Sequence, residues 1–411
     1  MNLLFIHQNF PAQFVHVAPA MAARGHTVVA LGVRPSLALP GVRYLQHQPL
    51  SPNGTSTSVA DRNSQDWATK LARAESAARA LVALKAEGFV PDVVFAHPAW
   101  GEALYVREIF PACRLITYAE YFYGAPQGDS FFDPEFNPAA PSLEALQRLR
   151  LKNTVLVHAL SVADQAVSPT HFQRSVHPAV YQPRIEVIHE GVDTDLLRPD
   201  PSAQVSLGRL SAPLGRDDEV VTFISRQLEP YRGYHVFMRC LPRLLALRPK
   251  ARVVIVGGDG VAYGAAAPKG KSWKSIFLDE VKDRVDMSRV HLVGTVPHAV
   301  LHQLLRVSSA HCYLTYPFVL SWSMLEAMSL GCVVVGSRTA PVEEVIEHGR
   351  NGLLTDFFDA DALADTLADA LDRRHSLQSL RDAARQTVVE RYDLKTVCLP
   401  RMLGFIEGTG T

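Results

Sequence analysis

The sequence predicts an α/β protein with two domains, each built around a doubly wound parallel sheet. Short apolar runs rich in β-forming residues alternate with amphipathic segments of helical length, which is the pattern of consecutive βαβ units. The pattern occurs twice along the chain. With 411 residues, of which 47% are hydrophobic, the chain is too long for one ordinary core and has enough apolar residues for two.

In the first half of the chain, helical segments separate the predicted strands. Two of the helices, at residues 13–24 and 65–87, end at Gly25 and Gly88, as expected for glycine C-caps. The strands are predicted at residues 3–7, 27–31, 92–97, 115–120, 165–168 and 185–189.

The second half repeats this layout after a linker. The linker is predicted at residues 195–202 and in the stretch that follows up to Asp218. Ser, Gly and Pro interrupt this stretch, which is typical of a connection between domains. We therefore predict domains at residues 1–196 and 197–390, with ligands in a cleft between the carboxyl edges of their sheets. The strands of the second half are predicted at residues 220–225, 252–257, 290–293, 312–316, 332–336 and 352–355.

Composition excludes nucleic acid as a partner and favours a cytoplasmic protein. Lys plus Arg and Asp plus Glu both number 41, so no net charge attracts the chain to a polyanion. The five cysteines lie far apart, mostly in apolar runs, which favours reduced thiols.

Residues 1–6 have the pattern of a buried strand, and no later run approaches the ~18 apolar residues of a membrane span. Membrane contact would be peripheral, at the inner face of the plasma membrane. Arg148, Arg150 and Lys152 suit such contact, although a solvated helix face explains them better.

Two arginines follow the first strand of the second half. Arg226 and Arg232 lie at its carboxyl end, and guanidinium groups bind phosphate oxygens in pairs, so the two residues suit a diphosphate. Two solvated loop arginines are the alternative. The later segment 316–331 favours the phosphate site, because a strand, a Ser-Trp-Ser turn at 321–323 and a short helix follow one another there. The first N–H groups of such a helix bind phosphate.

Glu326 is a carboxylate within that otherwise apolar helix. Because an unpaired buried carboxylate is costly, Glu326 needs partners. The two hydroxyls of a ribose would supply them, and a basic side chain from elsewhere in the fold is the alternative.

Polar residues also follow two strands of the first half. His97 stands at the carboxyl end of the strand at 92–97, where it suits a bond to a sugar hydroxyl or a structural role. His7, Asn9 and Gln13 follow the first strand and form a second polar loop that suits an acceptor.

Three other motifs lack the context that their chemistry needs. Residues 258–264 resemble a dinucleotide fingerprint, but Pro268 follows where a helix should begin, and residues 264–272 miss the P-loop spacing by one residue. Asp193 and Asp195 lie in a turn before the linker, and no His/Cys cluster has zinc spacing. We therefore expect no metal ion and no cofactor.

Together these segments resemble glycosyltransferase family 4, the retaining group 1 glycosyltransferases of the GT-B fold, over nearly the whole chain. The resemblance implies two Rossmann-like domains, an acceptor-binding first domain, a donor-binding second domain and a C-terminal helix at residues 391–411 that crosses back to the first. The segments that carry it are residues 10–14, 92–97, 167–169, 185–193, 225–233, 292–294 and 325–337.

The resemblance also implies roles for single residues. Arg226 and Arg232 would bind the donor diphosphate, Glu326 the ribose and His97 the donor sugar, and these four are the candidate catalytic residues. The donor-binding candidates are Gly294 and Val296 near the base, with Phe318, Ser321, Trp322, Ser323 and Met324; the acceptor-binding candidates are His7, Asn9 and Gln13.

Two positions depart from the family pattern. Arg232 stands where the family usually has Lys, which keeps the charge but changes its geometry. Phe318 replaces the first Glu of the Glu-x7-Glu pair, which normally contacts hydroxyls of the donor sugar. The second Glu of the pair, Glu326, is present.

The expected activity is a metal-independent, retaining transfer of a sugar from a UDP- or GDP-sugar to a glycan or lipid-linked acceptor in bacterial surface polysaccharide or glycoconjugate synthesis. The nucleotide sugar is a substrate, and no cofactor is implied. A non-catalytic nucleotide-sugar-binding protein and a nucleotide-sugar epimerase of the same fold are the main alternatives. A pyridoxal-dependent phosphorylase lacks a segment for its lysine, and an NAD-dependent oxidoreductase lacks a complete fingerprint.

Overall fold

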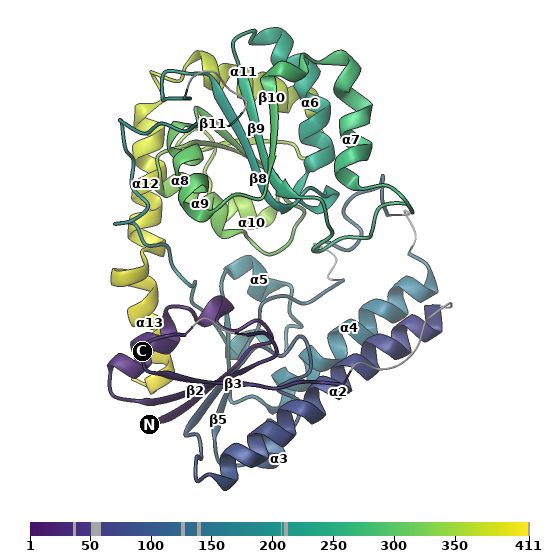
Figure 1. The fold of residues 1–411 in the computed structure, drawn as a ribbon, viewed down its shortest axis with the longest axis vertical. Helices are drawn as coiled ribbons and strands as arrows, with labels where there is room; N and C mark the ends of the chain where they lie inside the picture. Colours follow the sequence, from purple (N-terminus) through teal and green to yellow (C-terminus); the bar gives the residue numbers. More distant parts are fainter. Residues whose placement is uncertain are drawn as a thin grey trace. The chain divides into compact units, whose positions relative to one another are not determined.

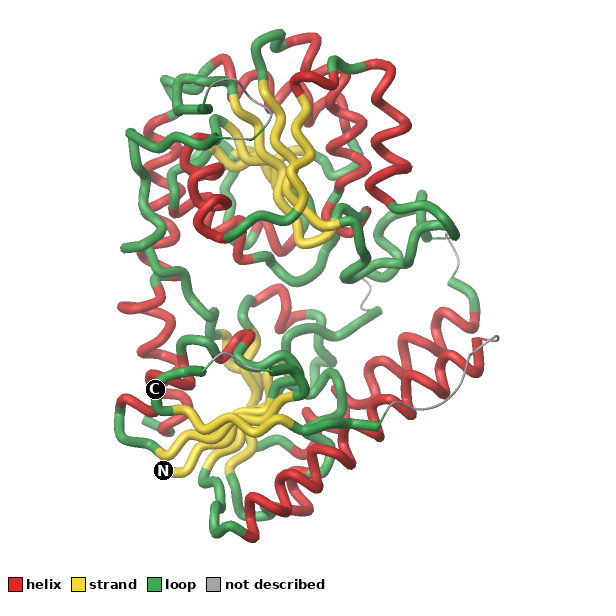
Figure 2. Tube along the Cα trace, in the orientation of Figure 1, coloured by secondary structure: helices red, strands yellow, loops and turns green. Residues whose placement is uncertain are grey.

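The computed structural model describes residues 1–35, 38–50, 59–124, 128–137, 141–206, 208 and 213–409. The chain divides into two compact units, the first formed by Met1–Glu190 with Cys398–Thr411 and the second by Gly191–Val397. The domain boundaries expected near residues 197 and 391 stay predictions. Each unit has a central parallel sheet flanked by helices (Figure 2).

The described part of the first unit forms a seven-stranded parallel sheet in the order β3-β2-β1-β4-β5-β6-β7. The chain extends the sheet from β1 to one side and then returns to place β4 beside β1, so that the order reverses between these two strands. The strands are β1 Asn2–Ile6, β2 Thr27–Gly32, β3 Val42–Gln46, β4 Val93–Ala96, β5 Arg114–Tyr118, β6 Gln165–Ser168 and β7 Ile185–Val187.

Both faces of this sheet are apolar because successive side chains of a strand point to opposite faces. Leu3 and Phe5 of β1 pack in a cluster with residues of α1 and α13, whereas Leu4 and Ile6 pack in a second cluster with α2 and α3. Helices α2 and α4 run side by side (Figure 1). The helices are α1 Val17–Ala23, α2 Val59–Ala86, α3 Val106–Ile109, α4 Leu143–Val162, α5 His171–Ser175 and α13 Leu399–Glu407, with 3-10 turns at Ala12–Phe14 and Gln182–Arg184.

The second unit has the same strand order. Its described residues form a six-stranded parallel sheet in the order β10-β9-β8-β11-β12-β13, so that the order reverses between β8 and β11. The strands are β8 Val220–Gln227, β9 Arg252–Gly258, β10 Val290–Gly294, β11 Ala310–Tyr313, β12 Val333–Ser337 and β13 Leu353–Thr355.

Helices cover both faces of this sheet as well (Figure 1). On one face, α8, α9 and α12 pack against the strands through apolar clusters. On the other face, Phe223 of β8 stacks on Phe237 of α6, which contacts α7 and α11. The helices are α6 Tyr234–Leu247, α7 Trp273–Val281, α8 His298–Val307, α9 Trp322–Ser329, α10 Ala340–Glu343, α11 Ala360–Asp372 and α12 Gln378–Tyr392; short turns occur at Pro230–Arg232, Lys282–Arg284 and Met287–Arg289, and a π-helical turn at Leu394–Cys398.

These two sheets confirm the predicted fold class, and each predicted strand is present, that at 165–168 with the predicted bounds and the others with shifted ends. The glycine caps are also confirmed. Gly25 and Gly88 both have positive φ, and the residue after each donates its N–H to a carbonyl five residues earlier, as in a Schellman motif. The five cysteines are buried and none forms a disulfide.

Two predictions need correction. The helix expected at residues 13–24 is a 3-10 turn at Ala12–Phe14 followed by α1 from Val17. Pro19 explains this start, because proline has no N–H to donate and is tolerated only in the first turn of a helix. The strand β3 was not predicted, since it is a half-exposed edge strand without a buried apolar run. No helix in the described residues is long and apolar enough to cross a membrane.

Candidate functional site

In the first unit, polar side chains gather where the strand order reverses. His7 follows β1, His97 follows β4 and Glu120 lies just beyond β5, so the parallel strands bring all three to one edge of the sheet. In open α/β sheets, ligands bind outside the carboxyl ends of the strands at this switch point.

The geometry of this cluster centres on His97. Its Nε2 lies 3.4 Å from Oε2 of Glu120, and Nε2 of Gln13 donates to Oε1 of the same carboxylate at 2.8 Å. The His97 ring stacks on Trp100, with 4.6 Å between centroids, and lies 5.0 Å from the His7 ring. Both histidines are only 2% exposed, so their rings are fixed by packing.

Charge in the cluster is set by burial and by His97. Burial, reinforced by the charge of His97, lowers the pKa of His7 well below 6.5, so His7 is neutral at physiological pH. Burial alone would raise the pKa of Glu120, but the hydrogen bond and charge of His97, together with Gln13, outweigh it and lower that pKa. An ionised Glu120 therefore faces His97 and orients its ring.

His7 also shapes the loop that follows β1. Its Nδ1 accepts a hydrogen bond from the backbone N–H of Asn9 at 2.9 Å, so the His7 side chain supports the loop as well as facing the cluster. Asn9 and Gln13 are partly buried in this loop. The cluster thus contains His97, His7 and Gln13, all expected from the sequence.

Sequence reasoning missed Glu120 and Trp100 as members of this cluster. The sequence pattern predicts a strand over 115–120, whereas β5 ends at Tyr118, which leaves Glu120 in the loop beyond the sheet. A single carboxylate directly after a buried strand was the available signal. No sequence signal indicated Trp100, because its contact with His97 depends on how the loop after β4 turns.

In the second unit, a cavity lies at the corresponding switch point, between the ends of β8 and β11. Arg226 comes from the last residues of β8, Arg232 from the turn after it and Ser321 from the N-cap of α9, and all three line the cavity. The structure therefore brings the two arginines and the Ser-Trp-Ser turn together, as expected for a phosphate site. Two cations and the start of a helix at one point favour an anion.

The two arginines differ in environment. Arg232 is 7% exposed, and its Nη1 donates to Thr315 Oγ1 at 2.8 Å and to the Val319 carbonyl at 3.1 Å. Arg226 is exposed. No carboxylate among the described residues forms an ion pair with either guanidinium. The buried guanidinium of Arg232 therefore has only neutral partners, and an anion bound beside it would offset the cost of burying its charge.

Gly233 fixes the path of the chain immediately after Arg232. Its φ is +68°, and a Cβ there would lie 2.3 Å from Cβ of Leu314. Only glycine fits a backbone that is both left-handed and this close to a neighbour. The position of Arg232 therefore depends on Gly233.

Phe318 forms an aromatic wall beside Arg232. Its ring is 3% exposed and contacts the rings of Tyr231 and Tyr263, at 5.4 and 5.1 Å between centroids. The guanidinium carbon of Arg232 lies 5.8 Å from the Phe318 ring and 5.1 Å from the Tyr263 ring. The position that carries a carboxylate in the family pattern is thus apolar here.

Glu326 lies on α9 and is partly buried. Burial raises the pKa of its carboxyl group, and the nearby His298 acts in the opposite direction. Within the described part of the chain, no side chain donates a hydrogen bond to this carboxylate. Among the described residues, His298 is thus near enough to act on this carboxylate but forms no hydrogen bond or close ion pair with it, so the group remains available for a ligand's hydroxyls.

The other expected donor-binding residues lie in three settings. Gly294 ends β10 with a φ of +71°, and Val296 packs partly against the core beside α8. Ser321 caps α9 by accepting from the Ser323 N–H, and Trp322 is 41% exposed. The side chain of Met324 is wholly buried in the core, and its N–H donates to the Ser321 carbonyl, so that residue supports the turn.

Two of the discounted motifs have structural roles. Lys395 forms ion pairs with Asp193, at 3.1 Å, and Asp195, at 2.8 Å. The carboxylate of Glu229 is wholly buried and accepts backbone N–H groups of residues 262–264, which holds the glycine-rich loop against the end of β8. That loop carries Tyr263 to the arginine cavity.

Two doubly wound parallel sheets, each with polar groups at its switch point, define a two-domain protein of the GT-B class. Residues 24–197 match the glycosyl transferase family 4 group, and residues 210–387 match the glycosyl transferases group 1. The two matches are adjacent and together span most of the chain. The chain therefore belongs to the group 1 glycosyltransferases, with a first half of the family 4 type.

Curated relatives share part of the sequence. A GDP-mannose-dependent alpha-(1-6)-phosphatidylinositol monomannoside mannosyltransferase of Mycobacterium tuberculosis is 28% identical over 229 residues, which are 54% of this chain and 56% of the relative. A D-inositol 3-phosphate glycosyltransferase of Mycobacterium avium is 27% identical over 246 residues, which are 60% of this chain and 51% of the relative. The chain thus spans about half the length of the curated relatives it matches.

Solved structures share the fold over nearly the whole chain. HepE of Anabaena, solved in complex with UDP, has a TM-score of 0.66 and 16% sequence identity, and the match covers 99% of this chain and 100% of HepE. Sucrose-phosphate synthase of Thermosynechococcus elongatus has a TM-score of 0.70 and 17% identity, covering 99% of this chain and 98% of the synthase. These likenesses show the fold.

Proposed function

We propose that this protein is a retaining, metal-independent glycosyltransferase that transfers a sugar from a nucleoside diphosphate sugar to a glycan or lipid-linked acceptor. The observation that carries the proposal is the cavity lined by Arg226, Arg232 and Ser321 at the switch point of the second sheet. Two arginines without carboxylate partners among the described residues, beside the start of α9, suit a diphosphate better than a neutral ligand.

The same groups suit catalysis. When the bond between the sugar and the phosphate breaks, negative charge develops on the leaving diphosphate and positive charge on the anomeric carbon. Arg226 and Arg232 stabilise the first of these charges without a metal ion. Since Arg232 is held by hydrogen bonds to Thr315 and the Val319 carbonyl before the donor binds, little reorganisation of its guanidinium is needed in the transition state.

Glu326 supplies the second contact to the donor. Its partly buried carboxylate accepts hydrogen bonds from the ribose hydroxyls, which lowers its desolvation cost. The donor nucleotide is UDP or GDP: HepE was solved with UDP, and the mycobacterial mannosyltransferase is named for GDP-mannose. Gly294 and Val296 contact the base in this proposal.

The acceptor binds to the first unit, at His7, Asn9 and Gln13, and the adjacent His97, which faces Glu120, contacts the donor sugar. These groups offer both donors and acceptors to sugar hydroxyls at the carboxyl edge of the sheet. The acceptor attacks the face from which the diphosphate leaves, within an ion pair, which gives retention of the anomeric configuration. Membrane contact in this proposal is peripheral, at the cytoplasmic face of the membrane that carries the acceptor.

The first experiment is a thermal-stability screen with UDP, GDP and their common sugar conjugates in the presence of a chelator. A ligand at a hundred times its dissociation constant stabilises a protein by about 2.7 kcal/mol, which gives a clear shift in melting temperature. We expect the melting temperature to rise with either the uridine or the guanosine nucleotides, and this rise should disappear in Glu326→Ala. The matched control is Glu343→Ala, which removes an exposed carboxylate on α10.

The outcomes separate the alternatives. Donor hydrolysis or transfer with a retained anomer, read by NMR, supports the transferase, whereas an inverted product rejects retention. An isomerised donor in the absence of acceptor indicates an epimerase. Binding without any turnover indicates a nucleotide-sugar-binding protein, the alternative that Phe318 favours. If no nucleotide shifts the melting temperature at millimolar concentration, the proposal fails.

A further inference from the structure

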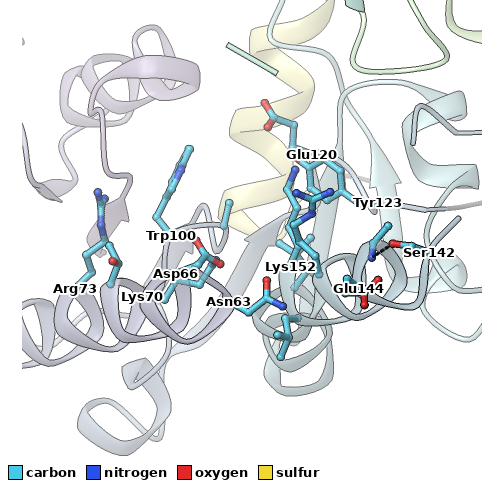
Figure 3. Close-up of a pocket in the computed structure, with 16 residues that line it drawn as sticks. Asn63, Asp66, Lys70, Arg73, Trp100, Glu120, Tyr123, Ser142, Glu144 and Lys152 are labelled. Carbon is cyan, nitrogen blue, oxygen red and sulfur yellow. Dashed lines mark hydrogen bonds and ion pairs between the residues drawn. The ribbon is translucent and has the colours of Figure 1, made fainter. Parts of the chain in front are cut away.

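Two cavities, one in each unit, differ in the charges that line them. The cavity of about 870 Å³ between α2 and α4 of the first unit holds cations and carboxylates together (Figure 3). Arg148 and Lys152 share it with Glu144 and Asp66, so it favours neither anions nor cations. The arginine cavity of the second unit has two guanidinium groups, and none of the described residues that line it carries a carboxylate.

The polar groups of the arginine cavity offer protons more readily than they accept them. Guanidinium groups only donate hydrogen bonds. The hydroxyl of Tyr313 already accepts from the Ser321 N–H at 2.8 Å, and the hydroxyl of Ser225 donates to the Gln227 carbonyl at 2.7 Å. An ionised diphosphate, which only accepts, suits this lining. A sugar hydroxyl packed against it finds few acceptors for its own proton.

Tyr263 presents an aromatic ring to this cavity. It is 37% exposed, whereas the neighbouring Phe318 is 3% exposed, and the two ring centroids lie 5.1 Å apart. The guanidinium carbon of Arg232 lies 5.1 Å from the Tyr263 centroid. Tyr263 is thus the accessible member of the aromatic wall, beside the cation that is expected to bind phosphate.

A buried carboxylate holds the loop that carries Tyr263, which connects β9 to α7. Glu229 is wholly buried and accepts the N–H groups of residues 262–264 at 3.2–3.3 Å. Gln227 accepts the Gly260 N–H at 2.7 Å. Consecutive N–H groups of this kind form a nest for an anion, and here the chain's own carboxylate fills it. This glycine-rich loop therefore positions Tyr263.

The order of contacts along the chain places the donor sugar at this wall. A nucleoside diphosphate sugar has its ribose and its sugar at opposite ends of the diphosphate. Glu326, which binds the ribose in the proposed function, follows Ser321 by about 7.5 Å along α9. Phe318 precedes Ser321 and contacts Tyr263. With the phosphates at Ser321 and the ribose at Glu326, the sugar lies on the side of Phe318 and Tyr263.

We propose that Tyr263 is a specificity-determining residue of the donor-sugar subsite and that this subsite takes a 6-deoxy hexose. The inference rests on the proposed function, which it makes more specific. The methyl group of such a sugar packs on the Tyr263 ring without leaving an O–H unpaired, whereas a hydroxymethyl group loses its hydrogen bonds to water there. An acetamido group also carries a methyl, but no carboxylate among the described lining residues accepts its N–H. Glu229 is a positioning residue that acts through Tyr263.

The test compares nucleotide sugars that differ in one substituent. Competition binding is measured with UDP-6-deoxyglucose and UDP-glucose, with GDP-6-deoxymannose and GDP-mannose, and with UDP-N-acetylglucosamine. With its preferred nucleotide, the wild type should bind the 6-deoxy conjugate at least about tenfold more tightly than the hydroxyl conjugate, the selectivity that one apolar group provides. Tighter binding of the hydroxyl or the acetamido conjugate would overturn the proposal.

Variants on the loop assign the selectivity to the ring. Tyr263→Ala should bring the affinities for the two conjugates to within about threefold of each other, whereas Tyr263→Phe, which keeps the ring, should preserve the preference. Val261→Ala is the matched control, because Val261 lies on the same loop, is 45% exposed and does not line the cavity. Affinity for the free nucleoside diphosphate should stay within about threefold in all three variants, and thermal melts confirm that they fold. An unchanged preference in Tyr263→Ala would reject the role of the ring.

A double variant tests the role of Glu229. Glu229→Gln should reduce the preference for the 6-deoxy conjugate, because the loop no longer holds Tyr263 in place. In the Tyr263→Ala background the same change should leave the preference unaltered, since Glu229 acts only through the ring. Losses of preference that add in the double variant would contradict this positioning role. If Glu229→Gln does not fold, the Tyr263 variants decide the proposal.

These results are distinguishable from failure of the proposed function. If UDP or GDP stabilises the protein through Glu326 but Tyr263→Ala leaves the preference among conjugates unchanged, only the 6-deoxy subsite is rejected. If no nucleotide binds, the proposed function fails and the subsite fails with it.

Discussion

Nε2 of His97 lies 3.4 Å from Oε2 of Glu120, and this contact joins the ends of two neighbouring strands of the first sheet. The carboxylate is held from its other oxygen by Gln13. Since His97 stacks on Trp100 as well, the imidazole is fixed in both direction and plane. The contact has consequences for stability and for ligand binding.

The first prediction concerns the pH dependence of stability at Glu120. Its folded-state pKa lies below the ordinary value of 4.5, so the ionised carboxylate stabilises the fold above pH about 4.5. That contribution is lost as the pH falls through the lower folded-state pKa. The free energy of unfolding in urea should therefore differ between wild type and Glu120→Gln at pH 6, and the difference should shrink on acidification. Parallel pH profiles for the two proteins would contradict this.

The second prediction concerns Arg226 and the diphosphate. Arg226→Gln should weaken nucleoside diphosphate binding by about 10–100-fold, the loss expected for one charge-assisted contact of about 1.5–3 kcal/mol. The fold should be unaffected, because Arg226 is exposed. Calorimetry with UDP and GDP measures the change. Arg350→Gln, which removes an exposed arginine paired with Glu347, is the control and should leave affinity unchanged.

The third prediction concerns Phe318 and donor choice. Phe318→Glu introduces a carboxylate into a site that is now 3% exposed, so the melting temperature should fall, with Arg232 offsetting part of the desolvation cost. Affinity for the free nucleoside diphosphate should change little, whereas the preference among its sugar conjugates should change. Competition binding with a panel of conjugates measures this. An unchanged preference would show that Phe318 does not face the sugar.

The fourth prediction concerns the glycine behind Arg232. Gly233→Ala combines left-handed strain of about 1–2 kcal/mol with a clash against Leu314, for which overpacking typically adds about 1–3 kcal/mol. Gly270→Ala is the matched control, because its φ is +81° but no heavy atom lies within 4 Å of the added Cβ. Chemical denaturation should show a larger loss of stability for Gly233→Ala. Equal losses would mean that Leu314 moves away without cost.

Much of the site could be predicted from local sequence. Gly25 and Gly88 marked helix ends, because few other residues adopt a positive φ at little cost. Arg226 and Arg232 followed an unmistakable buried strand, and the parallel topology then brought them to the start of α9 at Ser321. Polar residues at the carboxyl ends of parallel strands can be located in this way because the strand order confines them to one edge.

Other members could not be found without the fold. Glu120 and Trp100 meet His97 only because the loops after β4 and β5 turn toward each other. Phe318 stood out in the sequence as a departure, but its place in an aromatic wall depends on Tyr231 and Tyr263 from two other loops. Contacts of this kind join residues far apart in the chain, and no local pattern encodes them.

The sequence by itself determined the alternation of strands and helices, the two apolar cores and the family pattern, because these depend on periodicity and on residues that lie close together along the chain. Tertiary structure alone decided which charges are paired. The sequence pattern does not distinguish Arg148, Arg150 and Lys152. The packing of α4 beside α2 places Arg148 and Lys152 on the wall of a cavity and leaves Arg150 outside it. The electrostatic character of a basic residue is set by the groups around it in space, and only the folded chain supplies those groups.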